Sequence, residues 1–181
     1  MSGMQCRPLR LAGSLIVQPD VFRDERGYFK ETFSQQRYRE LGITDEFVQD
    51  NLSLSARNVL RGMHADARMA KLVQVLAGEA FDVIVDFRRG SPTFLQWEGV
   101  MLRASEHAQL YVPRGFLHGF LALADDTMLL YKQSAPYDAS SAVAVAWDDP
   151  TLGIDWPSIG GSPLLSESDR RNPSVESVAP L

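Results

Sequence analysis

The chain has 181 residues, of which 45% are hydrophobic, and its 18 Lys and Arg against 23 Asp and Glu give a formal net charge of −5. The acidic balance and the lack of a long basic run argue against a nucleic-acid partner. The only cysteine, Cys6, excludes a disulfide framework and a cysteine-rich zinc site. Length and apolar content suit one domain over residues 1–181, with a core of about 14–157 and a tail, 158–181, that packs back on it.

Targeting segments are not evident in the sequence. No stretch approaches the roughly 18 apolar residues of a membrane span, and residues 1–13 lack the apolar core of a signal peptide. With a single cysteine, these features predict a cytoplasmic protein that has no membrane partner.

The first half of the chain predicts short strands and one helix. Residues 14–19 form a β-like run that Pro19 ends, and residues 21–33 read as a strand pair with a turn at Arg26 and Gly27. Residues 34–41 are the best helical segment, with Ser34 as the candidate cap. A further strand is predicted over residues 47–53.

The second half is richer in strands. Residues 71–86 predict two strands around Gly78, and further strands are predicted at 94–102, 109–112, 113–122 and 128–133. Many short strands separated by Gly and Pro turns, with one convincing helix, are typical of an antiparallel sandwich or barrel.

Residues 58–75 hold the candidate active site. Arg61, His64 and Lys71 surround a short bend at Gly62 and lead into an apolar run. Burying such groups without partners is unfavourable, so we expect them to be paired or to face a pocket. Read alone, a histidine after a glycine bend is more often structural than catalytic, and the lysine reads equally well as an exposed residue at the start of a strand.

Motifs along nearly the whole chain resemble, in order, those of the dTDP-4-dehydrorhamnose 3,5-epimerase family. They are FRDERGYFKE at 22–31, FVQDN at 47–51, VLRGMH at 59–64, KLV at 71–73, GEAFDVIVD at 78–86, RGSPTF at 89–94, VPRGFLHGF at 112–120, LYK at 130–132, WDDP at 147–150, GIDW at 153–156 and LSESD at 165–169. The resemblance implies a mainly β, cupin-type jelly-roll barrel with few short helices, a homodimer with shared active sites, no metal and no redox cofactor. It implies an isomerase of dTDP-rhamnose-type deoxysugar biosynthesis, which serves cell-surface polysaccharide.

The resemblance also implies roles for particular residues. His64 is the general base paired with Asp169, Tyr131 is the acid on the opposite face of the sugar, and Lys71 steadies the enolate oxygen. The residues that fall at or near substrate- or nucleotide-binding positions of the family, some reaching in from the partner subunit, are Arg26, Glu31, Gln49, Asn51, Arg61, His118 and Tyr137.

These residue types suit epimerisation beside a ketone. The reaction removes a proton from carbon and returns one to the other face, and a free imidazole with a pKa of about 6.5 can act as the base near neutral pH. A carboxylate on its other nitrogen fixes the tautomer, and a cation beside the enolate oxygen stabilises the charge that develops there.

Other interpretations remain for single residues. Tyr131 and His118 also fit core positions with satisfied polar groups, and we expect His107 to be solvated. The three histidines at 64, 107 and 118 do not form the close pair that metal-binding cupins use.

The resemblance breaks at residues 65–70. The family usually continues from the base histidine with an aromatic, a glutamine and a longer loop, whereas this chain has ADARMA before Lys71. Asp66 and Arg68 either replace lost substrate contacts or are solvated. Pro136 stands where the family often has an aromatic residue. The resemblance implies that the substrate is a dTDP-4-keto-6-deoxyhexose inverted at C3, C5 or both. The alternatives are another nucleotide 4-keto sugar, inversion at one carbon only, a sugar 3,4-ketoisomerase, or a non-catalytic cupin that binds a nucleotide sugar.

Overall fold

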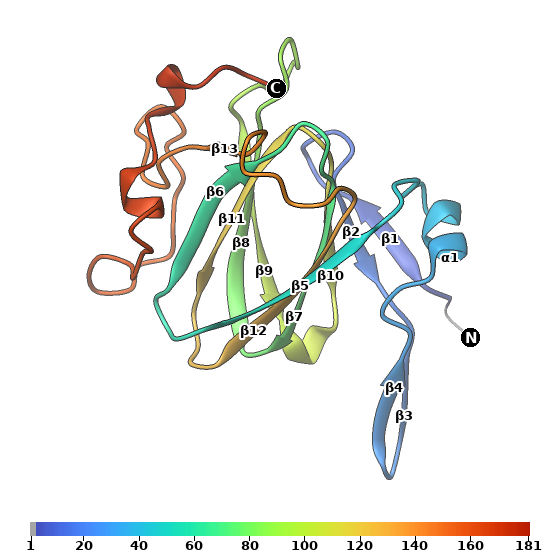
Figure 1. Cartoon of the computed structure of the whole chain (residues 1–181). Coiled ribbons are helices and arrows are strands. Elements are labelled where there is room, and N and C mark those ends of the chain that lie inside the picture. Colours follow the sequence, from blue (N-terminus) through green and yellow to red (C-terminus); the bar gives the residue numbers. More distant parts are fainter. Residues whose placement is uncertain (1–2) are drawn as a thin grey trace.

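The computed structural model describes residues 3–181, and within this range antiparallel strands form two large sheets and a hairpin (Figure 1). The six-stranded sheet has the order β1 (Gln5–Pro8), β2 (Leu15–Gln18), β10 (Gln109–Val112), β7 (Lys71–Ala77), β12 (Thr127–Gln133) and β5 (Gln49–Ser55). The five-stranded sheet has the order β13 (Val143–Ala144), β6 (Leu60–Ala65), β11 (Phe116–Ala122), β8 (Glu79–Asp86) and β9 (Trp97–Arg103). The predicted fold class, a mainly β, jelly-roll barrel, is confirmed.

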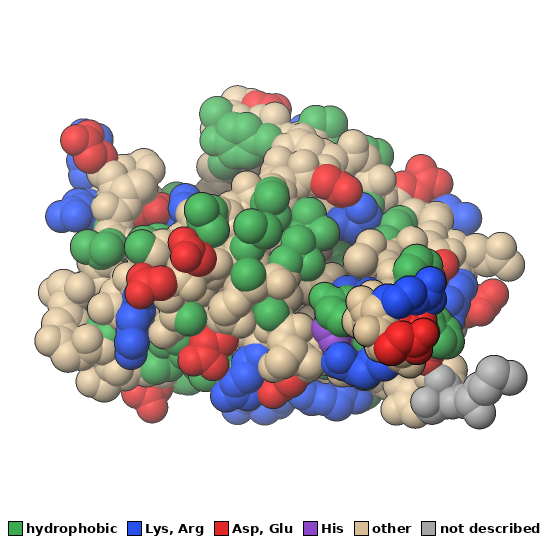
Figure 2. All heavy atoms as spheres, turned by 90° about the horizontal axis from the view of Figure 1, so that it is seen from below, with side chains coloured by type: hydrophobic (Ala, Val, Ile, Leu, Met, Phe, Trp, Pro, Cys, Tyr) green, Lys and Arg blue, Asp and Glu red, His purple; other side chains and the backbone are tan. Residues whose placement is uncertain are grey.

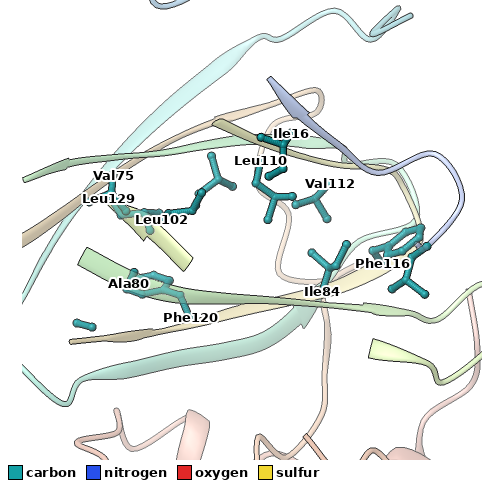
Figure 3. Close-up of a cluster of buried hydrophobic side chains, with 13 residues drawn as sticks. Ile16, Val75, Ala80, Ile84, Leu102, Leu110, Val112, Phe116, Phe120 and Leu129 are labelled. Carbon is teal, nitrogen blue, oxygen red and sulfur yellow. The ribbon is translucent and has the colours of Figure 1, made fainter. Parts of the chain in front are cut away.

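The main core lies between the two sheets. Side chains from β7, β10 and β12 meet side chains from β8, β9 and β11 there, among them Val75, Leu110, Ile84 and Phe120 (Figure 3). Every residue of β11 is buried, because this strand also has its outer face covered. Burial on both faces explains why β8 and β11 read as nearly continuous apolar runs in the sequence.

The outer faces are covered by different parts of the chain. Helix α1 (Gln35–Glu40) places Tyr38 in a cluster with Val17, Leu72 and Tyr111 on the six-stranded sheet. The C-terminal segment, with the short 3-10 helices η2 (Asp169–Arg171) and η3 (Val175–Ser177), lies along the outer side of the five-stranded sheet (Figure 1). Val175 is buried there in a cluster with Met63 and Leu117 of that sheet. A third 3-10 helix, η1 (Ala104–Glu106), links β9 to β10. Within residues 3–181, no helix is long and apolar enough to cross a membrane.

Several predicted elements have different bounds or geometry. Residues 58–64 do not form a simple bend, because Leu60–Ala65 is strand β6. The strand predicted from residue 94 begins at Trp97, because the preceding residues turn around the buried Asp86, which accepts hydrogen bonds from Ser91 and Thr93 at 2.6 Å each. Ser34 occupies the N-cap position of α1, but its side chain makes no capping hydrogen bond.

The hairpin β3 (Val21–Asp24) and β4 (Gly27–Lys30) extends away from both sheets (Figure 1). The prediction that His107 is solvated is wrong, because one face of this hairpin covers it. The Tyr28 ring packs 4.6 Å from the His107 ring, centroid to centroid, and Arg23 Nη2 lies 3.1 Å from its Nε2. Burial and the neighbouring charges of Lys30 and Arg23 lower the pKa of His107, so the imidazole is held neutral.

Candidate active site

A cavity of about 780 Å³ opens between the two sheets and the C-terminal segment. Both walls contribute polar side chains that the sequence singled out. The predicted site residues that line it are Arg61, His64, Lys71, His118, Tyr131, Tyr137 and Asp169.

A bulge in β6 directs two of these side chains into the cavity. Arg61 pairs with Phe120 and His64 pairs with His118, so three steps along β6 match two along β11. A regular strand would turn residues three apart to opposite faces, whereas the extra residue of a bulge lets both face the cavity. Gly62 makes the bulge possible, since its φ is +130° and a Cβ there would lie 2.5 Å from the Gly119 Cα.

His64 forms a dyad with Asp169, as the sequence predicted. The His64 Nε2 lies 2.7 Å from Asp169 Oδ1, although the two residues are far apart in the chain. The tail reaches this place because Leu60 N donates to the Leu164 carbonyl and Leu164 N donates to the Asn58 carbonyl.

The carboxylate of the dyad is held in its charged form. Burial alone would raise the pKa of Asp169, but the hydrogen bond and charge of His64 bring it below the usual value, with help from Ser166 and Asn172. A carboxylate bonded to Nε2 fixes the tautomer with its proton on that nitrogen and leaves Nδ1 as the basic atom.

Lys71 and His118 lie deeper in the cavity. Burial lowers the pKa of Lys71 to about 8, opposed by the negative charges of Asp82 and Asp66. His118 Nε2 donates to Asp82 Oδ1 at 2.9 Å, and burial lowers the pKa of His118. A neutral imidazole therefore stands beside a lysine that is still mainly protonated at pH 7.

Tyr131 comes from the other sheet. It lies on β12, in register with Val73 of β7 and Asn51 of β5. Burial raises the pKa of Tyr131, and the charge of Arg61 opposes this shift only in part. The phenol is therefore protonated near neutral pH and can donate a proton.

Four predicted binding residues are absent from the residues that line this cavity. Gln49 and Asn51 are close to it, because Gln49 Nε2 donates to Asn51 Oδ1 at 2.9 Å and Gln49 Oε1 accepts from the backbone N of Tyr137, which does line it. Arg26 is at the exposed hairpin tip in an ion pair with Asp24 at 2.5 Å, and Glu31 pairs with Arg37 at 3.1 Å.

The structure adds residues that the sequence left out or left open. Asp66 is buried, lines the cavity and accepts hydrogen bonds from Arg68 Nη2 at 2.8 Å and Ser141 Oγ at 2.6 Å. The hydrogen bond from Arg68 is the main reason that the pKa of Asp66 falls to about 2. The sequence motifs do not single out Asp82, although a lone carboxylate within an apolar strand is a signal for a buried polar contact. Gln133 also lines the cavity.

Among residues 3–181, no group of three or more His, Cys, Asp or Glu side chains is arranged to hold a metal ion. The polar groups that meet in the cavity are an imidazole with its carboxylate, a phenol and an ammonium group. Such a set can remove a proton from carbon, stabilise the resulting enolate and return a proton from the other side.

Known proteins similar to this chain share both its sequence and its fold. A model of the dTDP-4-dehydrorhamnose 3,5-epimerase family matches residues 8–177. An enzyme of that name from Methanothermobacter thermautotrophicus is 45% identical over 163 residues, which is 88% of each chain.

Solved structures give the same result. A dTDP-6-deoxy-D-glucose-3,5-epimerase from Legionella pneumophila, in complex with dTDP-4-keto-L-rhamnose, has a TM-score of 0.93 and 43% identity over 97% of this chain and 94% of its own. A 3'-monoepimerase from Streptomyces bikiniensis in complex with dTDP-quinovose has a TM-score of 0.86 and 35% identity over 92% of this chain and 86% of its own. The chain belongs to the dTDP-4-dehydrorhamnose 3,5-epimerase family.

Proposed function

We propose that this protein is an epimerase that inverts C3, C5 or both in a dTDP-4-keto-6-deoxyhexose, as a step in deoxysugar biosynthesis of the dTDP-rhamnose type. The observation that carries the proposal is the pairing of His64 with Asp169 on one wall of the cavity and Tyr131 on the other. A base and an acid on facing walls suit a reaction that removes and returns a proton on opposite faces of one carbon.

His64 acts as the base. With Nε2–H donating to Asp169, the Nδ1 atom takes the proton from the carbon next to the ketone, and the imidazolium that forms is stabilised by the carboxylate. The electron pair of the broken C–H bond moves into the enolate, whose negative charge gathers on the ketone oxygen.

Lys71 and Tyr131 complete the reaction. The buried ammonium of Lys71 faces the enolate oxygen and offsets its charge without having to reorganise. The Tyr131 hydroxyl then gives its proton to the opposite face of the carbon, and the two side chains regain their resting protonation states by exchange with water. Arg61 is close enough for its positive charge to lower the pKa of Tyr131. Its guanidinium group binds the diphosphate.

The nucleotide end of the site is shared between two subunits in this proposal. The hairpin that carries Arg26 also exposes Phe22 and Phe29 to 61% and 71%, and aromatic surface of this kind on a projecting ribbon suits an interface. Leu52 and Leu54, on the outer face of β5, are each 58% exposed. Hydrophobic side chains also lie exposed across the middle of the face seen in Figure 2.

We therefore propose a homodimer in which Arg26 and Glu31 contact the nucleotide in the partner's cavity. Gln49, Asn51 and Tyr137 contact it from the same subunit as the catalytic groups, and His118 contacts the substrate beside Lys71. Equilibrium sedimentation of the full chain checks the assembly, and a monomer at micromolar concentration would contradict it.

A narrower activity is the second candidate, in which one carbon is inverted or another nucleotide sugar is used. The observation that favours it is the mouth of the cavity, where Asp66 is tied to Arg68 and Ser141 instead of being free to meet substrate. This region is also where the sequence departs from the family.

Solvent exchange tests the proposal directly. The protein is incubated with dTDP-4-keto-6-deoxyglucose in heavy water, and NMR follows each ring hydrogen. We expect deuterium at C3, C5 or both together with an inverted product. Exchange at one position indicates a monoepimerase, and a ketone moved to C3 indicates a ketoisomerase. The absence of exchange at both carbons would contradict the proposal.

Ligand-induced shifts in melting temperature identify the nucleotide. A ligand present at 100 times its Kd stabilises the folded state by about 2.7 kcal/mol. We expect dTDP to raise the melting temperature more than UDP, GDP or CDP at equal concentration, and a larger shift with another nucleotide would redirect the substrate assignment.

A further inference from the structure

Gln133, at the end of β12, has a buried side-chain acceptor without a partner. The residue is 5% exposed and lines the cavity. Its Oε1 atom makes no hydrogen bond to the described part of the chain. Buried polar atoms are nearly always paired in folded proteins, so each exception calls for a physical reason.

Gln133 differs from the other unpaired atoms of this kind. Within residues 3–181, the remaining buried side-chain atoms without a partner are Ser53 Oγ, Asn58 Oδ1 and Gln74 Nε2. None of those residues is among the residues that line the cavity. Gln133 is therefore the case in which a ligand, rather than the protein, can satisfy the atom.

The register of the sheet shows which groups surround Gln133. It pairs with Lys71 of β7 on one side and with Gln49 of β5 on the other. Residues directly opposite each other in antiparallel strands share a face of the sheet, so Lys71, Gln133 and Gln49 form a polar row. Tyr131 lies two residues away on the same face and begins the next row.

This position determines what Gln133 can contact. An amide oxygen accepts hydrogen bonds, and a diphosphate at neutral pH offers no donor, so the partner is a hydroxyl or another N–H or O–H group. Lys71 beside it faces the ketone oxygen in the proposed mechanism, and Tyr131 faces the reacting carbon. With the hexose held between these two groups as proposed, its ring hydroxyls are the donors nearest to Gln133.

We propose that Gln133 is a specificity-determining residue whose Oε1 accepts a hydrogen bond from a ring hydroxyl of the hexose. The inference rests on the proposed function, because it takes the hexose to lie between Lys71 and Tyr131. Gln133 thereby selects for the sugar, while the nucleotide is bound beyond it, on the side of Gln49.

The effect of removing the acceptor separates the sugar from the nucleotide. Gln133→Met keeps the length of the side chain and removes its hydrogen-bonding atoms. Isothermal titration compares dTDP with dTDP-glucose, a stable probe with a full set of ring hydroxyls. We expect the Kd for dTDP to change less than twofold and the Kd for dTDP-glucose to rise about tenfold, the size that corresponds to one lost hydrogen bond.

Kinetics give a second readout. With dTDP-4-keto-6-deoxyglucose, Gln133→Met should raise KM more than it lowers kcat, since the proposed bond is present in both the bound substrate and the transition state. Gln133→Ala provides a smaller replacement and is used in the same assays if the Met variant does not fold. Each variant is first compared with the wild type by thermal melting.

Gln74→Met is the matched control. Gln74 is a buried glutamine on the neighbouring strand that also has an unpaired amide atom, but it accepts a hydrogen bond from Gln109 and does not line the cavity. The control should lower the melting temperature and leave the ratio of the two Kd values unchanged.

Equal weakening of dTDP and dTDP-glucose in Gln133→Met would assign the residue to the nucleotide and overturn the inference. An unchanged Kd for both ligands would overturn it as well. Failure of the proposed function has a different signature, because the wild-type protein would then show no solvent exchange at C3 or C5 whatever the variants do.

Discussion

The two walls of the cavity hold their ionisable groups in different ways. On the five-stranded sheet, His64 is bonded to Asp169 and His118 is bonded to Asp82. On the six-stranded sheet, burial is the main cause of the shifted pKa values of Lys71 and Tyr131, and Gln133 keeps an unpaired acceptor.

This difference matches the roles that we propose for the two walls. A base needs a fixed tautomer and orientation before substrate arrives, and a carboxylate partner supplies both. Groups that stabilise charge or donate a proton during the reaction gain most when substrate is their main polar partner, because a desolvated group interacts more strongly. In the proposed mechanism, the five-stranded wall is thus set in advance, and the six-stranded wall is completed by substrate.

The largest effect is expected from removing the proposed general base, His64, from the five-stranded wall. His64→Ala should lower kcat by about 10²–10⁴-fold, the usual contribution of a general base, and should abolish solvent exchange at carbon. Asp169→Asn keeps the shape but weakens the hold on the imidazole, so its loss should be smaller. Steady-state kinetics with both variants check the order, and an Asp169 variant worse than the His64 variant would contradict the roles given to them.

Removing the ammonium group of Lys71 from the six-stranded wall should lower activity without lowering stability. Lys71→Met should lower kcat by about 10²–10³-fold, as expected when one preorganised group at a developing oxyanion is lost. The melting temperature should stay the same or rise, because a buried ammonium group is costly to desolvate. A large fall in melting temperature would instead assign Lys71 a structural role.

The protonation state of Lys71 should also set how activity depends on pH. Because the pKa of Lys71 is about 8, kcat/KM should fall as the pH rises through about 8, where the free enzyme loses this positive charge. Lys71→Arg, which stays protonated in this range, should keep low activity with no such fall. A wild-type profile that is flat to pH 9.5 would contradict the assignment.

Lys71 should make the free energy of unfolding rise with pH, whereas it makes kcat/KM fall. The folded-state pKa of Lys71 lies below its ordinary value of 10.5, so between these two values the unfolded chain binds more protons than the folded one. The Lys71 contribution to the free energy of unfolding therefore rises with pH across this window, while activity falls. Lys71→Met should remove this rise in denaturant titrations.

The smallest effect is expected at the mouth of the cavity. Asp66→Asn removes the charge that holds Arg68 and Ser141, and a hydrogen bond to a charged group contributes about 1.5–3 kcal/mol. We expect a lower melting temperature and a modest rise in KM, with kcat within about tenfold of wild type. Since the pKa of Asp66 is lowered from 3.8 to about 2, the wild-type contribution is complete above pH 4 and is lost progressively as the pH falls to about 2.

Strands with a strong pattern could be predicted from the sequence, and weakly patterned ones could not. β7, β8 and β12 have long apolar runs or alternation, and they were predicted to within a residue or two. β1 is exposed along its whole length and β13 has two residues, so neither has a hydrophobic period to detect. The conformation of β6 depends on the close approach of Gly62 to Gly119, which only the paired sheet reveals.

The site shows a similar division. His64, Lys71, Tyr131 and Asp169 were predicted from family motifs, and they line one cavity. Asp82 and Gln133 needed the strand register, because Gln133 lies opposite Lys71 and Asp82 lies two residues from the strand partner of His118. The burial of His107 depends on the contacts that it makes with Tyr28, Arg23 and Lys30 of the hairpin, which local composition does not determine.

If acid and base act from opposite walls, Tyr131→Phe should separate proton removal from inversion when the reaction is run in heavy water. With His64 and Asp169 intact, the variant should still exchange the carbon-bound hydrogen of dTDP-4-keto-6-deoxyglucose for deuterium. Inversion should fall by about 10²-fold or more, because the proton donor on the far face is missing. Inversion that keeps pace with exchange in this variant would contradict the account.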